Sequence, residues 1–322
     1  MKTSVLLPFV PKRPEEVLPF GGLVSWSSAS RLWQGHSTLA DSHHTFSYLA
    51  GAGFRPPIGF GISLMALRNP FDAAVQARSV ALMTGQPVVA GFGPGALDFQ
   101  RGMMGQEYRS QIGACREYLT VVRGLLDGGE VDHAGDYFEV HAQLPPCPAP
   151  RVEVGLGVIR RRAAALAGEI ADVAITWLTP ARYIAETIAP AIAEGAERAG
   201  RQAPRVVAIV PVALEKDNRD PAVIALASNG PHLSTPHYQS MLRSGGVPLT
   251  GDLQKDAALL VENGAFLYGD EEQLVKQLMV YQAAGVDEVV LNTTGVSTLY
   301  GRQAAVRECA QILGCIEKAS GS

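Results

Sequence analysis

The sequence lacks the features that mark several protein classes. Its 322 residues include four cysteines, and no CxxC pair or cysteine–histidine cluster suggests a zinc site or a disulfide framework. No apolar run approaches the roughly 18 residues of a membrane span. The N-terminal stretch MKTSVLLPFVPKRPEE has too short an apolar core for a secretory signal. We therefore expect a soluble, cytoplasmic protein without a metal centre.

Charge of one sign is also missing. The 27 basic and 31 acidic residues leave a net charge of −4, and no basic stripe suggests a nucleic-acid partner. Hydrophobic residues make up 47% of the chain and charged residues 18%, a balance typical of a globular fold rather than a disordered chain. We expect neither nucleic-acid nor membrane binding.

Short apolar segments alternate with helical ones along the whole chain. Helices are expected in most of the intervals between them, and repeated strand–helix units predict parallel strands. Eight such units in one chain predict a TIM-type (β/α)8 barrel in a single domain, residues 1–322, with insertions near 128–150 and 216–263. The rival, an open doubly wound sheet, lacks its glycine fingerprint after the first strand. Strands are expected at 3–9, 31–34, 57–64, 87–92, 152–156, 172–177, 205–214 and 288–292.

Chemistry is expected where the strands of such a barrel end. His36 follows the second strand, and imidazole is the usual group for proton transfer near neutral pH. His43 and His44 are expected to open the next helix. Ser63 and Leu64 end the third strand, where the Ser63 hydroxyl is a candidate ligand group. A purely structural role is the alternative for each of these residues.

The fourth strand ends in GFGPG, which contains Gly91 and Gly93. Glycines allow a flat ligand to approach the backbone closely. The spacing matches neither a dinucleotide fingerprint nor a P-loop. By itself the segment therefore predicts either a turn or part of a ligand-binding floor.

The next two strand ends suggest an anion site. Gly155 and Gly157 end the fifth strand, and a helix is expected to begin near Arg160, where free backbone N–H groups bind phosphate. After the sixth strand, Trp177 and Thr179 precede Pro180. Thr179 is therefore expected to cap a helix and to face a phosphate.

Four segments together resemble the bacterial-luciferase-like oxidoreductases, which include flavin-dependent monooxygenases and deazaflavin (coenzyme F420)-dependent enzymes. The resemblance covers nearly the whole chain and is weakest in the first thirty residues and in 216–263. The segments are GFGPGALDFQRG, EYLTVVRGLLDGGEVDHAGDYFEV, the pair RVEVGLGV and LAGEIADVAITW, and YQAAGVDEVVLN.

The resemblance implies a barrel with the cofactor across the strand ends. The ring is implied near Ser63, Leu64, Gly91 and Gly93, with a bulge or non-proline cis peptide at Ser63–Leu64. His36 matches a family site residue in a segment that often reads Asp-His and here reads Gly35-His36. The phosphate is implied on the backbone of the fifth strand end, and the further cofactor-binding candidates are Gly155, Leu156, Gly157, Val158, Arg160, Trp177 and Thr179.

The segments PVVAGFGPG and HAGDYF are similar in sequence to those of deazaflavin-linked members of the family. The expected function is an F420H2-dependent reductase acting on an activated double bond, such as dehydroalanine in a lanthipeptide, which yields D-alanine. His36 is the candidate proton donor or carbonyl-positioning residue. One alternative is an FMN-dependent monooxygenase of a small organic substrate, and another is a non-catalytic cofactor-binding barrel. Relatives commonly pair, so a homodimer is expected.

Overall fold

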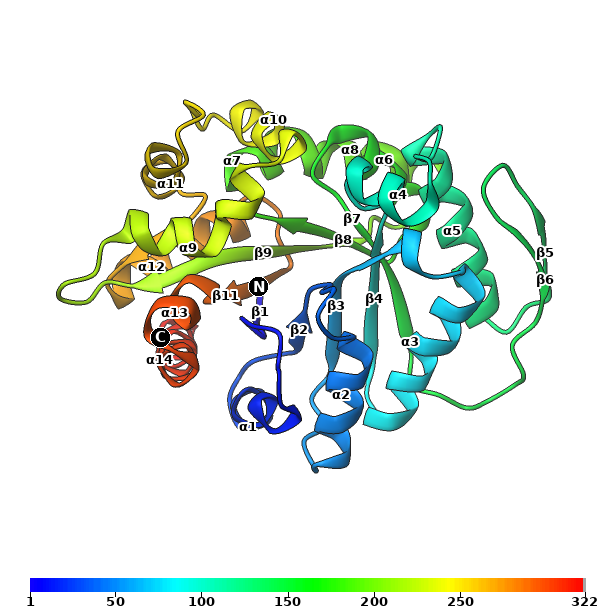
Figure 1. The fold of residues 1–322 in the computed structure, drawn as a ribbon, viewed down its shortest axis with the longest axis horizontal. Coiled ribbons are helices and arrows are strands. Elements are labelled where there is room, and N and C mark those ends of the chain that lie inside the picture. The colour runs from blue at the N-terminus through cyan, green and yellow to red at the C-terminus, as the bar shows by residue number, and fades with distance from the viewer. Residues whose placement is uncertain (321–322) are drawn as a thin grey trace.

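The computed structural model describes residues 1–320 and has eight parallel strands closed into a barrel (Figure 1). Closure occurs because β8 pairs with β9 and β11 pairs with β1. The predicted TIM-type (β/α)8 fold is confirmed. The strands are β1 (Lys2–Leu6), β2 (Leu32–Gln34), β3 (Ile58–Leu64), β4 (Val88–Gly93), β7 (Val152–Gly157), β8 (Val173–Trp177), β9 (Arg205–Leu214) and β11 (Glu288–Asn292).

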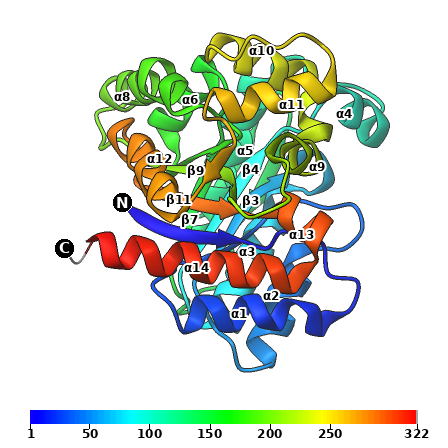
Figure 2. The same cartoon turned by 90° about the vertical axis from the view of Figure 1, so that its left-hand side faces the viewer.

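Helices connect the strands and cover the outside of the barrel. In α3 the Asn69 side chain accepts the Phe71 N–H, Pro70 occupies the first turn, and Gly85 ends the helix with a φ of 67°. Figure 2 shows α14 beside α1, on the side away from α10. The main covering helices are α1 (Leu18–Ser25), α2 (Ser42–Gly51), α3 (Pro70–Thr84), α5 (Gln111–Leu126), α6 (Arg161–Ile170), α8 (Ala189–Arg198), α12 (Glu271–Ala283) and α14 (Arg302–Ser320).

Short elements fill several connections. The segment before α1 is a 3-10 turn, as is the one after β3, and a π-helical turn links α7 to α8. The sequence had not indicated α4 or α13. These elements are η1 (Pro14–Val17), η2 (Met65–Leu67), α4 (Leu97–Met104), α7 (Ala181–Tyr183), η3 (Ile184–Ile188) and α13 (Thr294–Tyr300).

Both predicted insertions are additions to the barrel. The first contains an antiparallel hairpin of β5 (Val131–Ala134) and β6 (Glu139–Ala142). The second contains three helices, followed by β10 (Leu267–Gly269), which pairs with β9. No helix within residues 1–320 is both long and apolar enough to cross a membrane. The helices of the second insertion are α9 (Pro221–Leu233), α10 (Pro236–Ser244) and α11 (Leu253–Glu262).

A separate apolar cluster fills the barrel interior. Trp33 is fully buried there, and it fits because β3 carries glycine beside it: a Cβ on Gly59 would lie 2.3 Å from Trp33 Cδ2. The cluster alternates along each strand with residues that face the helices, as a closed barrel requires. Its buried members are Leu6, Trp33, Val89, Val173, Ile175, Val207, Ile209 and Val290.

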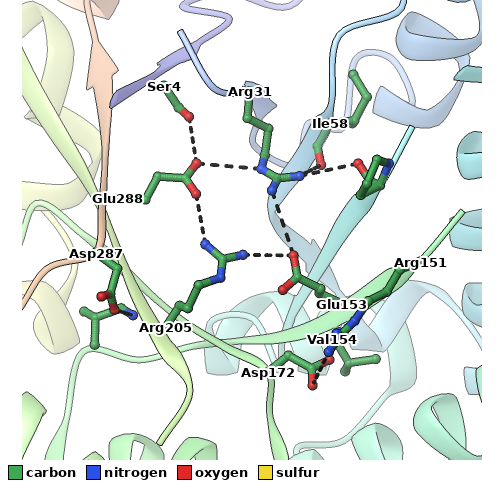
Figure 3. Close-up of polar contacts among 12 residues, drawn as sticks. Ser4, Arg31, Ile58, Arg151, Glu153, Val154, Asp172, Arg205, Asp287 and Glu288 are labelled. Carbon is green, nitrogen blue, oxygen red and sulfur yellow. Dashed lines mark hydrogen bonds and ion pairs between the residues drawn. The ribbon is translucent and has the colours of Figure 1, made fainter. Parts of the chain in front are cut away.

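Below this cluster, a ring of buried charges closes the barrel floor at the strand N-terminal ends (Figure 3). Glu288 Oε2 accepts from Arg205 at 3.1 Å, and Arg205 also donates to Glu153 at 2.9 Å. Arg31 lies 3.7 Å from Glu288 and 3.9 Å from Glu153, and it donates to the Ile58 carbonyl. Burial lowers the pKa of Arg31, and the two carboxylates act against that effect.

We predict that Glu288→Gln destabilises the fold by about 3 kcal/mol, because it leaves two arginines in the barrel floor without a full counter-charge. Glu288 is fully buried and also accepts from Ser4 at 2.7 Å and from Trp33 Nε1 at 2.8 Å. The measurement is the free energy of unfolding in urea. Glu197→Gln, at an exposed position on α8, is the control and should change it by less than about 0.5 kcal/mol. Equal effects of the two variants would contradict the prediction.

Candidate functional site

The mouth of the barrel, where the strands end at their C-termini, brings together most of the predicted residues. Strand register decides which side chains face it. Leu64 pairs with Gly93 on the inner face, whereas Ser63 pairs with Phe92, whose ring packs at 5.3 Å on Tyr118 of α5. Ser63 therefore faces the helices, because neighbours in parallel strands share a face. Phe92 packs in the helical layer and leaves the mouth to Leu64 and Gly93.

An irregularity in β3 produces this reversal. The register between β3 and β4 shifts between Phe60 and Ser63, and the peptide bond Gly61–Ile62 is cis. The sequence comparison with the family placed such a bond at Ser63–Leu64, so that position was wrong by two residues. The bulge turns two consecutive inner positions, Gly61 and Ile62, into the barrel.

The glycines of β4 and β7 have a packing explanation. A Cβ on Gly91 would lie 2.3 Å from the Phe60 carbonyl oxygen and 2.4 Å from Ile175, and one on Gly93 would lie 2.5 Å from Ile62. A Cβ on Gly155 would lie 2.9 Å from Ile175. These glycines admit Ile62 and Ile175 across the barrel. Their role under a cofactor ring stays a prediction.

His36 lies in the loop after β2 and is half-buried. Its Nε2 atom is buried and has no hydrogen-bond partner in the described part of the chain, and its ring lies edge-on to Phe99 of α4, with the ring centroids 6.3 Å apart. Burial lowers the pKa of His36, and the Arg68 charge lowers it further, while Asp41 acts in the opposite direction. At neutral pH the imidazole is therefore mainly neutral.

Sequence reasoning missed Asp41 and Arg68. Asp41 caps α2 by accepting the His43 N–H at 2.8 Å, pairs with the His43 ring at 2.7 Å, and forms an ion pair with Arg68. The His43 ring stacks on Phe60 at 4.3 Å, so His43 has a structural role, and α2 begins close to where the sequence predicted it. Asp41 thus supplies a carboxylate near His36 that Gly35 does not.

Thr179, which follows β8, does not cap a helix as the sequence predicted. The cap position before α7 is Pro180 and has no side-chain hydrogen bond. Thr179 is buried and donates its hydroxyl to the Trp177 carbonyl at 3.1 Å, so it is not the helix cap. Leu178 between them has a φ of 54°, a strained conformation of the kind that collects at functional sites.

The predicted phosphate cradle lies at the end of β7. Leu156 pairs with Phe92 in the sheet, and the Val158 N–H donates to the Ile175 carbonyl at 2.7 Å, so the backbone at these two residues is already engaged. The free N–H groups therefore belong to the first turn of α6, for which Arg160 is the cap residue. Arg160 is exposed, and its charge acts on two neighbours. Burial lowers the pKa of His237 and Arg160 lowers it further, whereas burial raises the pKa of Tyr183 and Arg160 opposes that rise.

A polar helix face at the mouth was not predicted at all. The His232 ring of α9 stacks on Trp177 at 5.4 Å with an interplanar angle of 24°, and Trp177 Nε1 has no partner. Ser228 and Asn229 lie one turn earlier on the same helix, and both are buried with an unpartnered oxygen. No motif marks these residues, because the sequence SNGPHL resembles a helix break.

The opposite end of the barrel carries charges that are mutually paired. A hollow of about 650 Å³ beside α5 and α6 is lined by Arg123, Asp172 and Arg201, among others, but Arg123 forms ion pairs with Asp172 and Asp127. Within residues 1–320, no group of three or more histidine, cysteine, aspartate or glutamate side chains is arranged to hold a metal ion.

Known proteins share this architecture. The family model described as luciferase-like monooxygenase matches residues 16–288. An F420-dependent glucose-6-phosphate dehydrogenase of Nocardia farcinica (strain IFM 10152) is 26% identical over 272 residues, which cover 79% of each chain. An F420-dependent secondary alcohol dehydrogenase in complex with an F420–acetone adduct superposes with a TM-score of 0.75, 18% identity and 98% coverage of each chain. EDTA monooxygenase from Chelativorans sp. BNC1 superposes with a TM-score of 0.76 and 15% identity, over 99% of this chain and 94% of that one.

We predict that His232 makes the fold acid-sensitive. Burial lowers its pKa from the ordinary 6.5 to about 4, and His237 adds to this. The unfolded chain then binds a proton between pH 6.5 and about 4 that the folded chain does not, so stability falls as the pH falls through this window. His232→Phe should remove about 2 kcal/mol of that loss, measured by urea unfolding at pH 7 and pH 4.5. The exposed His44→Gln variant should keep the full pH dependence.

Proposed function

We propose that this chain, which belongs to the luciferase-like monooxygenase family, is a reductase that uses reduced F420. In the proposed reaction a hydride adds to the β-carbon and a proton to the α-carbon of a double bond conjugated to a carbonyl. Dehydroalanine in a lanthipeptide is the acceptor we favour, and D-alanine is then the product. The cofactor choice is supported by the F420-dependent relative, which is 26% identical over 79% of the chain.

The residues of the mouth fit such a cofactor. The first turn of α6 offers free N–H groups beside Arg160, which suits an anionic group. Leu64, Gly93 and Gly157 lie on the inner face at the strand ends, where a flat ring would be held. When bound, reduced F420 supplies hydride chemistry without activating oxygen.

The unpartnered Nε2 of His36 is the observation that carries the proposal. A buried imidazole nitrogen without a partner at the mouth is available to a substrate. In its charged form His36 can donate a proton to the acceptor, and in its neutral form it can position the acceptor carbonyl. Burial is the main influence on the balance between these forms because it lowers the pKa of His36, and Arg68 lowers it further while Asp41 raises it.

A second candidate is an FMN-dependent monooxygenase, which the similarity to EDTA monooxygenase favours. A barrel that binds cofactor without turnover is the third candidate.

Titration of the protein with F420 and with FMN, followed by measurement of oxygen uptake with each reduced cofactor, separates the three candidates. Our proposal requires tighter binding of F420 and no oxygen uptake. Oxygen uptake with reduced FMN alone would select the monooxygenase, and binding without turnover of any acceptor would select the third candidate. Light scattering tests the proposed homodimer.

We predict that His36→Gln lowers kcat with reduced F420 by about 100-fold or more while F420 affinity changes less than about twofold. If His36 donates the proton, wild-type kcat falls as pH rises through a pKa below the ordinary 6.5 of histidine, because only the charged form donates. This limb of the pH profile should be absent in His36→Gln. His44→Gln, exposed on α2, serves as the control and should retain both kcat and the limb. Unchanged turnover in His36→Gln would remove His36 from the mechanism.

A further inference from the structure

Helix α9 crosses the barrel mouth. At its start, the Ile224 carbonyl packs so closely on α13 that a Cβ on Gly295 would lie 2.3 Å from its oxygen. At its end, His232 stacks on Trp177 of β8. Because β9 lies between β8 and β11 in the barrel, α9 spans the mouth above β9, and Figure 1 shows it alongside that strand.

The face that α9 turns inward carries polar side chains in its second half. Ser228 and Asn229 lie one helical turn before His232, on the side that also buries Ile224 and Ala225 one turn earlier. Asn229 donates its amide N–H to the Ala225 carbonyl at 3.1 Å, which leaves its Oδ1 atom free. The Asn229 side chain is therefore held in place by its own helix.

Five buried polar atoms around this part of the mouth have no hydrogen-bond partner within residues 1–320. They are Ser228 Oγ, Asn229 Oδ1, His232 Nδ1, Trp177 Nε1 and Asn292 Nδ2. Asn292 ends β11, and its Oδ1 accepts the Thr294 N–H at 3.0 Å. Each buried polar atom without a partner costs about 1–3 kcal/mol. Folded proteins keep few of these, so five in one region call for a bound molecule or ordered water that completes their hydrogen bonds.

The burial of these groups is nearly complete. The exposed fractions of Ser228, Asn229 and Asn292 are 7%, 0% and 1%. None of the five residues carries a formal charge at neutral pH. The titratable group that acts on His232 is His237, whose own pKa is lowered by burial and by Arg160, so Arg160 is the charged group of this set at neutral pH. A carboxylate or phosphate bound against Asn229 would be buried without a counter-charge at that position, which is strongly unfavourable.

The donor and acceptor pattern is specific. The Trp177 and Asn292 nitrogens can only donate, the Asn229 oxygen can only accept, and the Ser228 hydroxyl and the His232 ring can do either. A ligand that satisfies them must offer acceptors and at least one donor without a charge. A secondary amide, with one C=O and one N–H, has that combination.

We propose that Ser228, Asn229 and Asn292 bind an uncharged amide of the acceptor, so that the substrate is a peptide-like molecule and not a sugar phosphate or a free carboxylic acid. That the bound molecule is the hydride acceptor rests on the proposed function. The amide site itself rests only on the five unpartnered atoms.

Direct binding tests the site without turnover. The probes are N-acetyl-D-alanine N′-methylamide, which is neutral, and N-acetyl-D-alanine, which differs by carrying a carboxylate. Titration of the full chain, with and without F420, by ligand-observed NMR should show at least about tenfold tighter binding of the diamide. Equal or tighter binding of the acid, or no binding of the diamide, would overturn the proposal.

Three variants test the residues. Ser228→Ala should weaken diamide binding about fivefold, as loss of one hydrogen bond between neutral groups predicts. Asn292→Asp keeps the oxygen that accepts the Thr294 N–H but removes the donor, and it should weaken binding about tenfold or more. Ser240→Ala, at an exposed position on α10, is the matched control and should bind like the wild type. Equal affinity in all four proteins would contradict the assignment.

Turnover separates this inference from the proposed function. With reduced F420, N-acetyl-dehydroalanine N′-methylamide should be reduced with a lower KM than N-acetyl-dehydroalanine, and Ser228→Ala should raise that KM with little change in kcat. Reduction that favours the acid or glucose 6-phosphate would overturn the amide site and leave the reductase in place. Diamide preference in binding without any F420-dependent turnover would support the site and refute the reductase.

Discussion

The buried ion ring at the barrel floor is the constraint on which the rest of the structure depends. Glu288 is fully buried and is joined to Arg31 and Arg205, and Glu153 completes the ring. These side chains, with Ser4 and the Ile58 carbonyl, come from or next to six of the eight strands. A slip of one residue in β7, β9 or β11 would turn Glu153, Arg205 or Glu288 outward and leave its partner without a counter-charge. The ring therefore helps to specify the register of these three strands and, with it, the position of their ends at the mouth.

Polarity then changes in layers along the barrel. Above the satisfied charges lies the apolar cluster around Trp33, Ile175 and Ile209. Above that cluster the polar groups return, but at the mouth they lack partners. The same side-chain chemistry thus has two uses. At the floor the polar groups form ion pairs that maintain the fold, and at the mouth they are available to a ligand, which agrees with the division between stability and activity in barrels of this class.

The strands and most helices were predictable because local rules govern them. Pro70 and Gly85 bound α3 as expected, and alternating segments fixed the strand count. Residues whose orientation depends on other strands were not predictable. Ser63 faces the helices because a bulge in β3 shifts the register. Thr179 bonds to the Trp177 carbonyl instead of capping a helix, because Pro180 takes the cap position. Helix α9 continues through Pro231, where the sequence suggested a break, and so brings His232 onto Trp177.

These layers explain why neither the family nor the fold determines which substrate the protein binds. The floor and the apolar cluster belong to the strands, which a barrel of this type needs whatever it binds. Ser228, Asn229 and His232 belong to α9, which lies in the insertion at 216–263 and outside the barrel strands. An insertion can change its polar face without disturbing the ring below, because the apolar cluster separates the two. Relatives that act on a phosphorylated sugar, a secondary alcohol or EDTA are therefore compatible with one scaffold. The acceptor of this protein has to be deduced from the side chains that α9 places over β9, and those side chains are neutral.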